Sequence, residues 1–188
     1  AYFGDGREFG LNLAYLMMNE PYGVPFTLDQ AYPFVRNVTV VFGFPDIIFK
    51  PDDAFSKLLE KLTESAVDIV LGLFKAPQPH MMDMVGMGSE GQISNIQIKP
   101  TSTKHHYTWI IAAWAPSFTQ FMHEYLSLIH KKGDTAMRNQ EVFLSDVINA
   151  AMLNDMKVDR VTFADGICLD IGIPENLANV AQLVPEAL

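Results

Sequence analysis

Hydrophobic residues along the chain gather in short runs, and longer stretches of mixed character separate these runs. The runs are rich in β-branched and aromatic side chains and are too short for buried helices, which is typical of strands. The continuous run at 38–42 is expected to form a strand that is buried on both faces. In all, we predict strands over residues 11–17, 38–42, 68–74, 107–114, 158–163 and 167–170.

The stretches between these runs repeat their apolar residues with the period of a helix. Residues 51–63 are the clearest case, because a proline and two acids open the first turn and four apolar side chains share one face. These four are Phe55, Leu58, Leu59 and Leu62. Residues 25–35 are a further predicted helix, with Thr27 as a candidate N-cap. We also predict helices over residues 117–131, 139–154 and 174–183.

Glycines interrupt short alternating segments between residues 80 and 99, which indicates hairpin strands. The alternation of strands and helices elsewhere argues for an α/β fold, with a mainly parallel sheet covered by helices on both faces. A chain of 188 residues can bury one substantial core, so we expect a single domain over residues 1–188.

Charge and composition narrow the choice of partners. The net charge is −9, and the basic residues form no cluster beyond Lys131 and Lys132, so we expect no nucleic-acid partner. No segment approaches the roughly 20 apolar residues that span a membrane, so we expect no membrane partner. The single cysteine, Cys168, permits no internal disulfide and favours a reducing, cytoplasmic compartment. Its simplest role is that of a small buried apolar side chain.

Two acidic residues follow predicted strands. Asp46 comes just after the strand at 38–42 stops, and Asp170 ends the strand at 167–170. Ligands of open α/β sheets bind beyond the carboxyl ends of the strands, so both acids are placed to hold a metal or a substrate. Mg²⁺ prefers one or two carboxylates together with water and phosphate oxygens, and this pair fits that preference. The alternative is that Asp46 only caps a turn.

Other candidate groups have simpler explanations. The four methionines within residues 81–87 are better explained as flexible core filler than as a metal site. His105 and His106 are adjacent, so on a strand they point to opposite faces and cannot bind one ion together. Trp109 and Trp114 are candidates for an assembly interface, but ordinary core packing explains them more simply.

The order of short motifs along the chain resembles that of the sugar-phosphate nucleotidyltransferase family, such as glucose-1-phosphate thymidylyl- and uridylyltransferases. Each motif is short, but all of them occur in the family's order across nearly the whole chain. The resemblance implies a Rossmann-like nucleotide-diphospho-sugar transferase sheet that here lacks its first strands. The motifs are Tyr-Phe-Gly-Asp-Gly at 2–6, Tyr15, Glu-Pro-Tyr-Gly at 20–23, Pro-Asp-Ile-Ile-Phe at 45–49, Lys-Pro at 99–100, the acidic segment 141–146 and Leu-Asp-Ile-Gly-Ile-Pro-Glu at 169–175.

The resemblance also implies an activity: transfer of a nucleotidyl group from a nucleoside triphosphate to a sugar 1-phosphate, with release of pyrophosphate. In such transfers the protein mainly positions the reactants, and a metal lowers the repulsion between two anions. By resemblance, Asp46 and Asp170 are the catalytic pair that holds Mg²⁺. Lys99 pairs with the phosphate of the sugar, and Gly23 lets the backbone approach the base.

Several residues depart from the family's pattern. Met18 stands where the family has a Gln that reads the base, and Ile98 stands where it has a Glu before the motif lysine. Asp83 takes the place of a Gly that contacts the sugar, and Ile47 takes the place of an Asn. An apolar side chain cannot accept a hydrogen bond from a sugar hydroxyl. The identities of base and sugar therefore do not carry over.

The Gly-rich loop with which the family cradles the triphosphate has no counterpart in this sequence. We therefore expect the chain to be a piece of a longer protein, inactive alone, in which another segment or a second copy completes the sheet. Without that completion, the strand at 11–17 lacks its neighbour and the strand at 38–42 has an unpaired edge. The alternative function is a non-catalytic domain that binds a nucleotide or sugar and regulates another activity.

Overall fold

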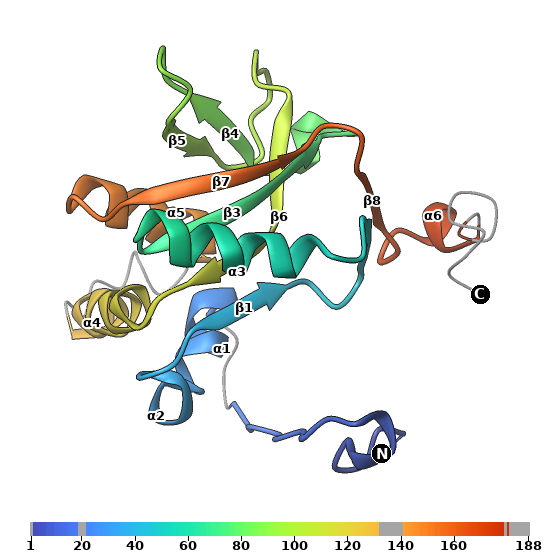
Figure 1. The fold of residues 1–188 in the computed structure, drawn as a ribbon, viewed down its shortest axis with the longest axis vertical. Coiled ribbons are helices and arrows are strands. Elements are labelled where there is room, and N and C mark those ends of the chain that lie inside the picture. Colours follow the sequence, from blue (N-terminus) through green and yellow to red (C-terminus); the bar gives the residue numbers. More distant parts are fainter. Residues whose placement is uncertain (1, 19–21, 132–140, 179, 181–188) are drawn as a thin grey trace.

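The computed structural model describes residues 2–18, 22–131, 141–178 and 180. Within these residues, six strands form one sheet in the order β5–β4–β6–β3–β7, with β1 beside β6 (Figure 1). Two further strands, β2 (Ile47–Lys50) and β8 (Ile167–Asp170), pair with each other as a separate ribbon. The strands of the large sheet are β1 (Val40–Gly43), β3 (Ile69–Lys75), β4 (Met84–Met87), β5 (Ile93–Gln97), β6 (Tyr107–Trp114) and β7 (Val158–Phe163).

The large sheet is assembled on β6. One edge of β6 runs antiparallel to β3, and its other edge is shared by β1 and β4. Among the described strands, β3 and β7 alone pair in parallel. The prediction of a mainly parallel sheet is therefore wrong, because β4, β5 and β6 follow one another without the crossover helices that parallel neighbours need. The predicted hairpin within residues 80–99 is confirmed as the antiparallel pair β4–β5.

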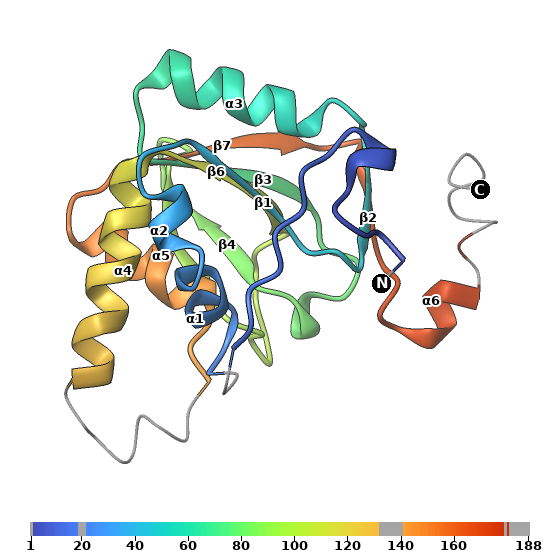
Figure 2. The same ribbon diagram turned by 90° about the horizontal axis from the view of Figure 1, so that it is seen from below.

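Helices cover both faces of the sheet, as the sequence predicts (Figure 2). On one face, the buried side chains of α3 contact β3 and β6. On the other face, α4 and α5 enclose a second cluster with Trp109 and Trp114 at its centre, so core packing explains both tryptophans. The predicted apolar side of α3 is confirmed for Leu58 and Leu62, whereas Leu59 is exposed. These helices are α3 (Ala54–Ser65), α4 (Pro116–Lys131) and α5 (Leu144–Leu153).

The shorter helices differ more from the predictions. The stretch 25–35 forms two helices instead of one, and Pro33, which lacks an N–H, lies in the first turn of the second helix. Thr27 is not the N-cap, because Gly23 takes that position and the Thr27 hydroxyl donates to the Gly23 carbonyl. Residues 139–140 and 181–183, at the ends of two predicted helices, lie outside the described residues. The shorter helices are α1 (Val24–Asp29), α2 (Tyr32–Val35), α6 (Pro174–Ala178) and the 3₁₀ turns η1 (Arg7–Phe9) and η2 (Pro79–Met81).

Of the two strands predicted nearest the N-terminus, one is absent and the other is less buried than expected. Residues 11–17 form no strand and are exposed, because no described strand lies beside them to complete a ladder. The strand at 38–42 exists as β1, but it is only half-buried, with the Val41 side chain 46% exposed. Among the described strands, β1 pairs with β6 alone, so only one of its edges is hydrogen-bonded.

Within the part of the chain that the structure describes, no helix has the length and apolar character to cross a bilayer.

Candidate active site

The β2–β8 ribbon brings the two predicted acids together. Asp46 directly precedes β2 and Asp170 ends β8, and the register pairs Ile47 with Asp170. The Ile171 amide donates to the Asp46 carbonyl oxygen at 2.8 Å, which extends the ladder past the end of the strands. Residues that are more than 120 positions apart in sequence are thus joined by backbone hydrogen bonds at one end of a two-stranded ribbon.

The two carboxylates converge on Gly172. The position that a Cβ atom would take at Gly172 lies 3.1 Å from Oδ1 of Asp170 and 3.1 Å from Oδ2 of Asp46. The Gly172 amide also donates to Oδ1 of Asp170 at 2.9 Å, which orients that carboxylate. Asp46 is exposed, and its carboxylate makes no hydrogen bond or ion pair with the described residues. Its oxygens are therefore open to a ligand.

These acids lie in the wall of a cavity of about 290 Å³. Its lining includes four acidic residues and the aromatic residues Trp109 and Phe143. Lys99 is the sole basic side chain among the described residues that line it. The charged lining residues are Asp46, Asp83, Lys99, Glu141 and Asp170.

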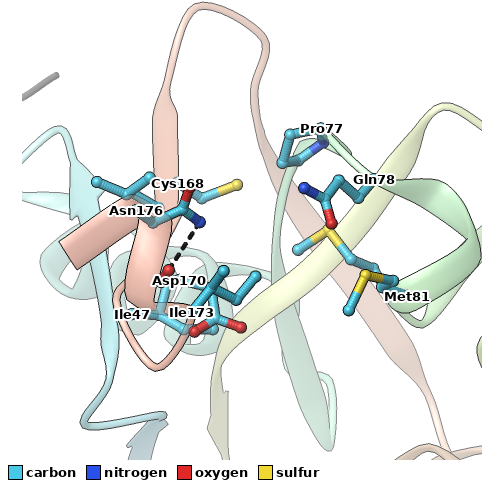
Figure 3. Close-up of a pocket in the computed structure, with 10 residues that line it drawn as sticks. Ile47, Pro77, Gln78, Met81, Cys168, Asp170, Ile173 and Asn176 are labelled. Carbon is cyan, nitrogen blue, oxygen red and sulfur yellow. Dashed lines mark hydrogen bonds between the residues drawn. The ribbon is translucent and has the colours of Figure 1, made fainter. Parts of the chain in front are cut away.

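A smaller neighbouring cavity of about 140 Å³ shares Ile47, Met81, Met82 and Asp170 with the first. Figure 3 shows Asp170 on one side of this space, with the Gln78 amide and Met81 opposite. The Asn176 side-chain amide donates to the Asp170 carbonyl oxygen at 2.8 Å, so α6 helps to hold the end of β8. The Gln78 amide is a polar group that sequence reasoning did not single out.

The Lys99 side chain projects from a loop just after β5, where the backbone has a φ of +39°. Its Nζ lies 5.1 Å from the centroid of the Phe143 ring, a distance that suits a cation–π contact. With the described residues, Lys99 makes no ion pair. The ammonium group is therefore available to an anionic ligand in the cavity.

The Asp83 carboxylate is held from the interior of the protein. Its Oδ2 accepts a hydrogen bond from the Ser145 hydroxyl, and the Ser145 oxygen accepts one from Trp109 Nε1 at 2.9 Å. Oδ1 is buried and has no hydrogen-bond partner among the described residues. Burial raises the pKa of the Asp83 carboxyl, and the hydrogen bonds from the Ser145 hydroxyl and the Lys99 backbone amide, together with the Lys99 charge, oppose this effect only in part.

Gly23, the fourth predicted site residue, does not line either cavity. Its φ of +113° lies in the region that favours glycine, and a Cβ there would collide with the Val142 carbonyl oxygen. The structure thus places Gly23 at a close backbone contact between α1 and the segment before α5. Whether the backbone also faces a base stays a prediction.

The donor set suits a hard cation better than a transition metal. Among the described residues, no group of three or more His, Cys, Asp or Glu side chains could hold a metal ion. Two carboxylates alone match the way Mg²⁺ is bound, because this ion keeps water and takes further oxygens from substrate phosphates. Asp46 and Asp170 therefore fit the ion that the sequence resemblance implies.

Comparison with known proteins bears on the fold and the family resemblance. No protein-family model matches the sequence. A glucose-1-phosphate thymidylyltransferase of Mycolicibacterium smegmatis is 27% identical over 104 residues, which cover 55% of this chain and 35% of that protein. A Bacillus anthracis protein, crystallised with sucrose and described as a glucose-1-phosphate thymidylyltransferase, superimposes with a TM-score of 0.80 and 20% identity. This superposition covers 100% of the present chain and 71% of the other.

The fold is therefore a Rossmann-like α/β fold of the nucleotidyltransferase type. The resemblance to the sugar-phosphate nucleotidyltransferase family, which the motifs indicated, is confirmed by a relative in sequence and a neighbour in structure. The sequence match spans about a third of the length of the M. smegmatis enzyme.

Proposed function

We propose that the protein is an Mg²⁺-dependent nucleotidyltransferase that joins a nucleoside triphosphate and a sugar 1-phosphate and releases pyrophosphate. The observation that carries the proposal is the convergence of Asp46 and Asp170 around Gly172, in the wall of a cavity that also contains Lys99. We treat residues 1–188 as one domain, because the helices on both faces pack on the same strands, β3 and β6.

In this proposal each residue has a separate task. Asp46 and Asp170 would hold Mg²⁺, which when bound would offset the repulsion between the two phosphate-bearing reactants. Lys99 would bind the phosphate of the sugar, since its ammonium has no carboxylate partner in the described structure. The aromatic side chains of Trp109 and Phe143 would limit the access of water to the cavity. Catalysis would come from positioning and charge neutralisation rather than from covalent chemistry.

The site as described would serve the sugar phosphate and the metal better than the triphosphate. A triphosphate carries several negative charges, and Lys99 is the sole basic group among the described lining residues. We therefore propose activity for the complete gene product and binding, without turnover, for residues 1–188.

The first test measures binding. Asp46→Asn and Asp170→Asn should each weaken Mg²⁺-dependent binding of a sugar 1-phosphate by about tenfold or more, because each removes a charged ligand from the ion. Isothermal titration calorimetry with and without Mg²⁺ measures this, and Mn²⁺ binding by proton relaxation gives a readout that needs no substrate. Asp165→Asn is the matched control, since Asp165 is exposed and lines neither cavity.

The second test measures the reaction. The complete gene product should release pyrophosphate with at least one pairing from a panel of nucleoside triphosphates and sugar 1-phosphates. A folded protein that releases none with any pairing would contradict the proposal.

A non-catalytic binding domain is the second candidate, and the residues at Met18, Asp83 and Ile98 favour it because they depart from the family's substrate-reading residues. In that case Asp46→Asn should change neither turnover nor the Mg²⁺ dependence of ligand binding. The calorimetric comparison above therefore separates the two candidates.

A further inference from the structure

Lys99 holds a backbone conformation that few residues other than glycine adopt. Its φ is +39°, and it lies two positions after the end of β5. Such a conformation is strained for a residue with a side chain, and it persists only where neighbouring groups hold it. Strained positions of this kind cluster at ligand sites. Lys99, which the proposed function assigns to the phosphate of the sugar, therefore needs a support for its backbone.

The Asp83 carboxylate provides such a support. It accepts a hydrogen bond from the Lys99 backbone amide, and the Lys99 charge favours its ionised form. The register of the β4–β5 hairpin explains this proximity, because Met84 pairs with Gln97 and the next step of the same ladder sets Asp83 beside Ile98 and Lys99. Asp83 and Lys99 thus meet at the open end of one hairpin.

Asp83 is itself fixed to the core of the protein. Its Oδ2 accepts a hydrogen bond from the hydroxyl of Ser145, which is fully buried and in turn accepts one from Trp109 Nε1. The Thr108 hydroxyl, on β6, donates to the Asp83 carbonyl oxygen at 2.9 Å. Because Oδ1 is buried as well, it is not open to a ligand. Asp83 therefore connects Lys99 to β6 and α5 and does not bind a substrate itself.

The Lys99 side chain lies against the same part of the fold. Its Nζ is 5.1 Å from the centroid of the Phe143 ring, and Phe143 is the N-cap residue of α5. The Phe143 amide donates to Oδ2 of Asp146 at 3.0 Å, which fixes the start of that helix. The backbone of Lys99 is linked to α5 through Asp83 and Ser145, and its ammonium through Phe143. A group that is held in advance loses less conformational freedom when it binds an anion.

We propose that Asp83 is a positioning residue: by holding the Lys99 backbone amide, it directs the Lys99 ammonium toward the phosphate of the sugar. This inference rests on the proposed function, because it takes Lys99 as the phosphate-binding group. Without an acceptor at position 83, the loop after β5 would relax to an unstrained conformation and the ammonium would turn away from the ligand. Asp83 acts through Lys99 and does not touch the substrate.

The first test measures amide hydrogen exchange by NMR and needs no ligand. In the unaltered protein the Lys99 amide should exchange slowly, like the Ile96 amide, which donates to Oδ1 of Asn149 at 2.8 Å and is the internal control. Two variants of similar side-chain size both remove the charge: Asp83→Asn keeps an acceptor oxygen, and Asp83→Leu does not. Exchange at Lys99 should become about tenfold faster or more in Asp83→Leu and stay slow in Asp83→Asn, with Ile96 unchanged in both.

Fast exchange of the Lys99 amide in the unaltered protein would overturn the inference, and this result does not depend on whether any variant folds. Equal exchange at Lys99 in folded Asp83→Asn and Asp83→Leu would overturn it as well.

The second test measures binding by calorimetry with Mg²⁺ at neutral pH, using the sugar 1-phosphate of the panel that binds most tightly. Because Asp83→Asn and Asp83→Leu carry the same charge, the difference between them reports on the hydrogen-bond acceptor. Asp83→Leu should bind about fivefold more weakly than Asp83→Asn, since Lys99 is no longer held in advance. When each is combined with Lys99→Met, the two should bind equally, because no ammonium is left to position.

A merely structural role for Asp83 predicts a different result, because a general loss of order would weaken binding whether or not Lys99 is present. A difference between the two variants that survives Lys99→Met would therefore overturn the inference. The outcomes also separate the two proposals. Binding that depends on Lys99 but is equal in Asp83→Asn and Asp83→Leu would overturn this inference and leave the proposed function standing, whereas no binding of any sugar 1-phosphate would overturn both.

Discussion

The antiparallel pairs β3–β6 and β2–β8 use the same hydrogen-bonding pattern, but they differ in burial. Side chains along β3 and β6 are almost all buried between helices on two faces. Those of β2 and β8 are mostly half-buried, and the ribbon is only four residue pairs long. The first pair therefore supplies stability, whereas the second mainly positions two acids. A site placed at the end of a short ribbon at the margin of the core can change its residues with little cost to folding.

The largest expected effect on stability comes from truncating one aliphatic residue in each of the two strand pairs. Leu71→Ala, in the middle of β3 and fully buried, should lower the free energy of unfolding by about 3 kcal/mol. Ile48→Ala, in half-buried β2, should cost about 1 kcal/mol or less because solvent already reaches that site. Urea denaturation followed by circular dichroism measures both. Equal losses would show that the ribbon belongs to the same cooperative core.

Two glycines give the next test. Gly72→Ala in β3 places a methyl group against the buried Ile111 side chain and should cost about 1–3 kcal/mol of unfolding free energy. Gly172→Ala places a methyl group between the Asp46 and Asp170 carboxylates, where it should weaken Mn²⁺ binding and change stability much less. Thermal unfolding and proton relaxation report the two effects. The comparison fails if Gly172→Ala unfolds the protein or leaves the affinity for Mn²⁺ unchanged.

Ionisation of Asp83 should lower the free energy of unfolding as the pH rises. Because burial raises the pKa of its carboxyl in the folded state, the folded protein holds this proton more tightly than the unfolded chain does. The contribution to stability is present at low pH and is lost as the pH rises through the folded pKa, from about pH 4 upward. Asp83→Asn should therefore be more stable than the unaltered protein at pH 7, by about 1 kcal/mol, and the difference should shrink in acid. Urea denaturation at several pH values tests this, and a constant difference would contradict it.

Asp159, on β7 of the large sheet, should show the opposite dependence with the smallest effect. Burial alone would raise the pKa of its carboxyl, but the hydrogen bonds and charges of Lys61 and Arg160 outweigh burial and lower the pKa. The Lys61 ammonium lies 2.9 Å from the carboxylate. Its stabilisation is present above the ordinary pKa of about 4 and is lost as the pH falls through the lowered value. Lys61→Met should remove a few tenths of a kcal/mol at pH 7 and nothing in strong acid, as measured by urea denaturation.

Much of the fold could be predicted because a buried strand or helix leaves a pattern of apolar residues in its own stretch of sequence. Runs such as those of β3 and β6 are apolar on both faces, so their position follows from the sequence alone. The pattern could not give their direction, because parallel and antiparallel buried strands have similar compositions. Residues 11–17 have a strand-like pattern, but a pattern cannot supply the neighbour that a strand requires.

The candidate site, like the fold, has features that the sequence predicts and features that it does not. The sequence by itself determined which residue types follow the strands, so Asp46, Lys99 and Asp170 could be singled out from motif order. Only the tertiary structure decided that β2 pairs with β8, that Ser145 and Trp109 fix Asp83, and that one oxygen of Asp83 is left without a donor. The physical reason is distance along the chain. Secondary structure follows from neighbours a few positions apart, whereas Asp83 and Ser145 are 62 positions apart and the paired strands β2 and β8 are more than 100 apart. These residues meet only when the core has formed.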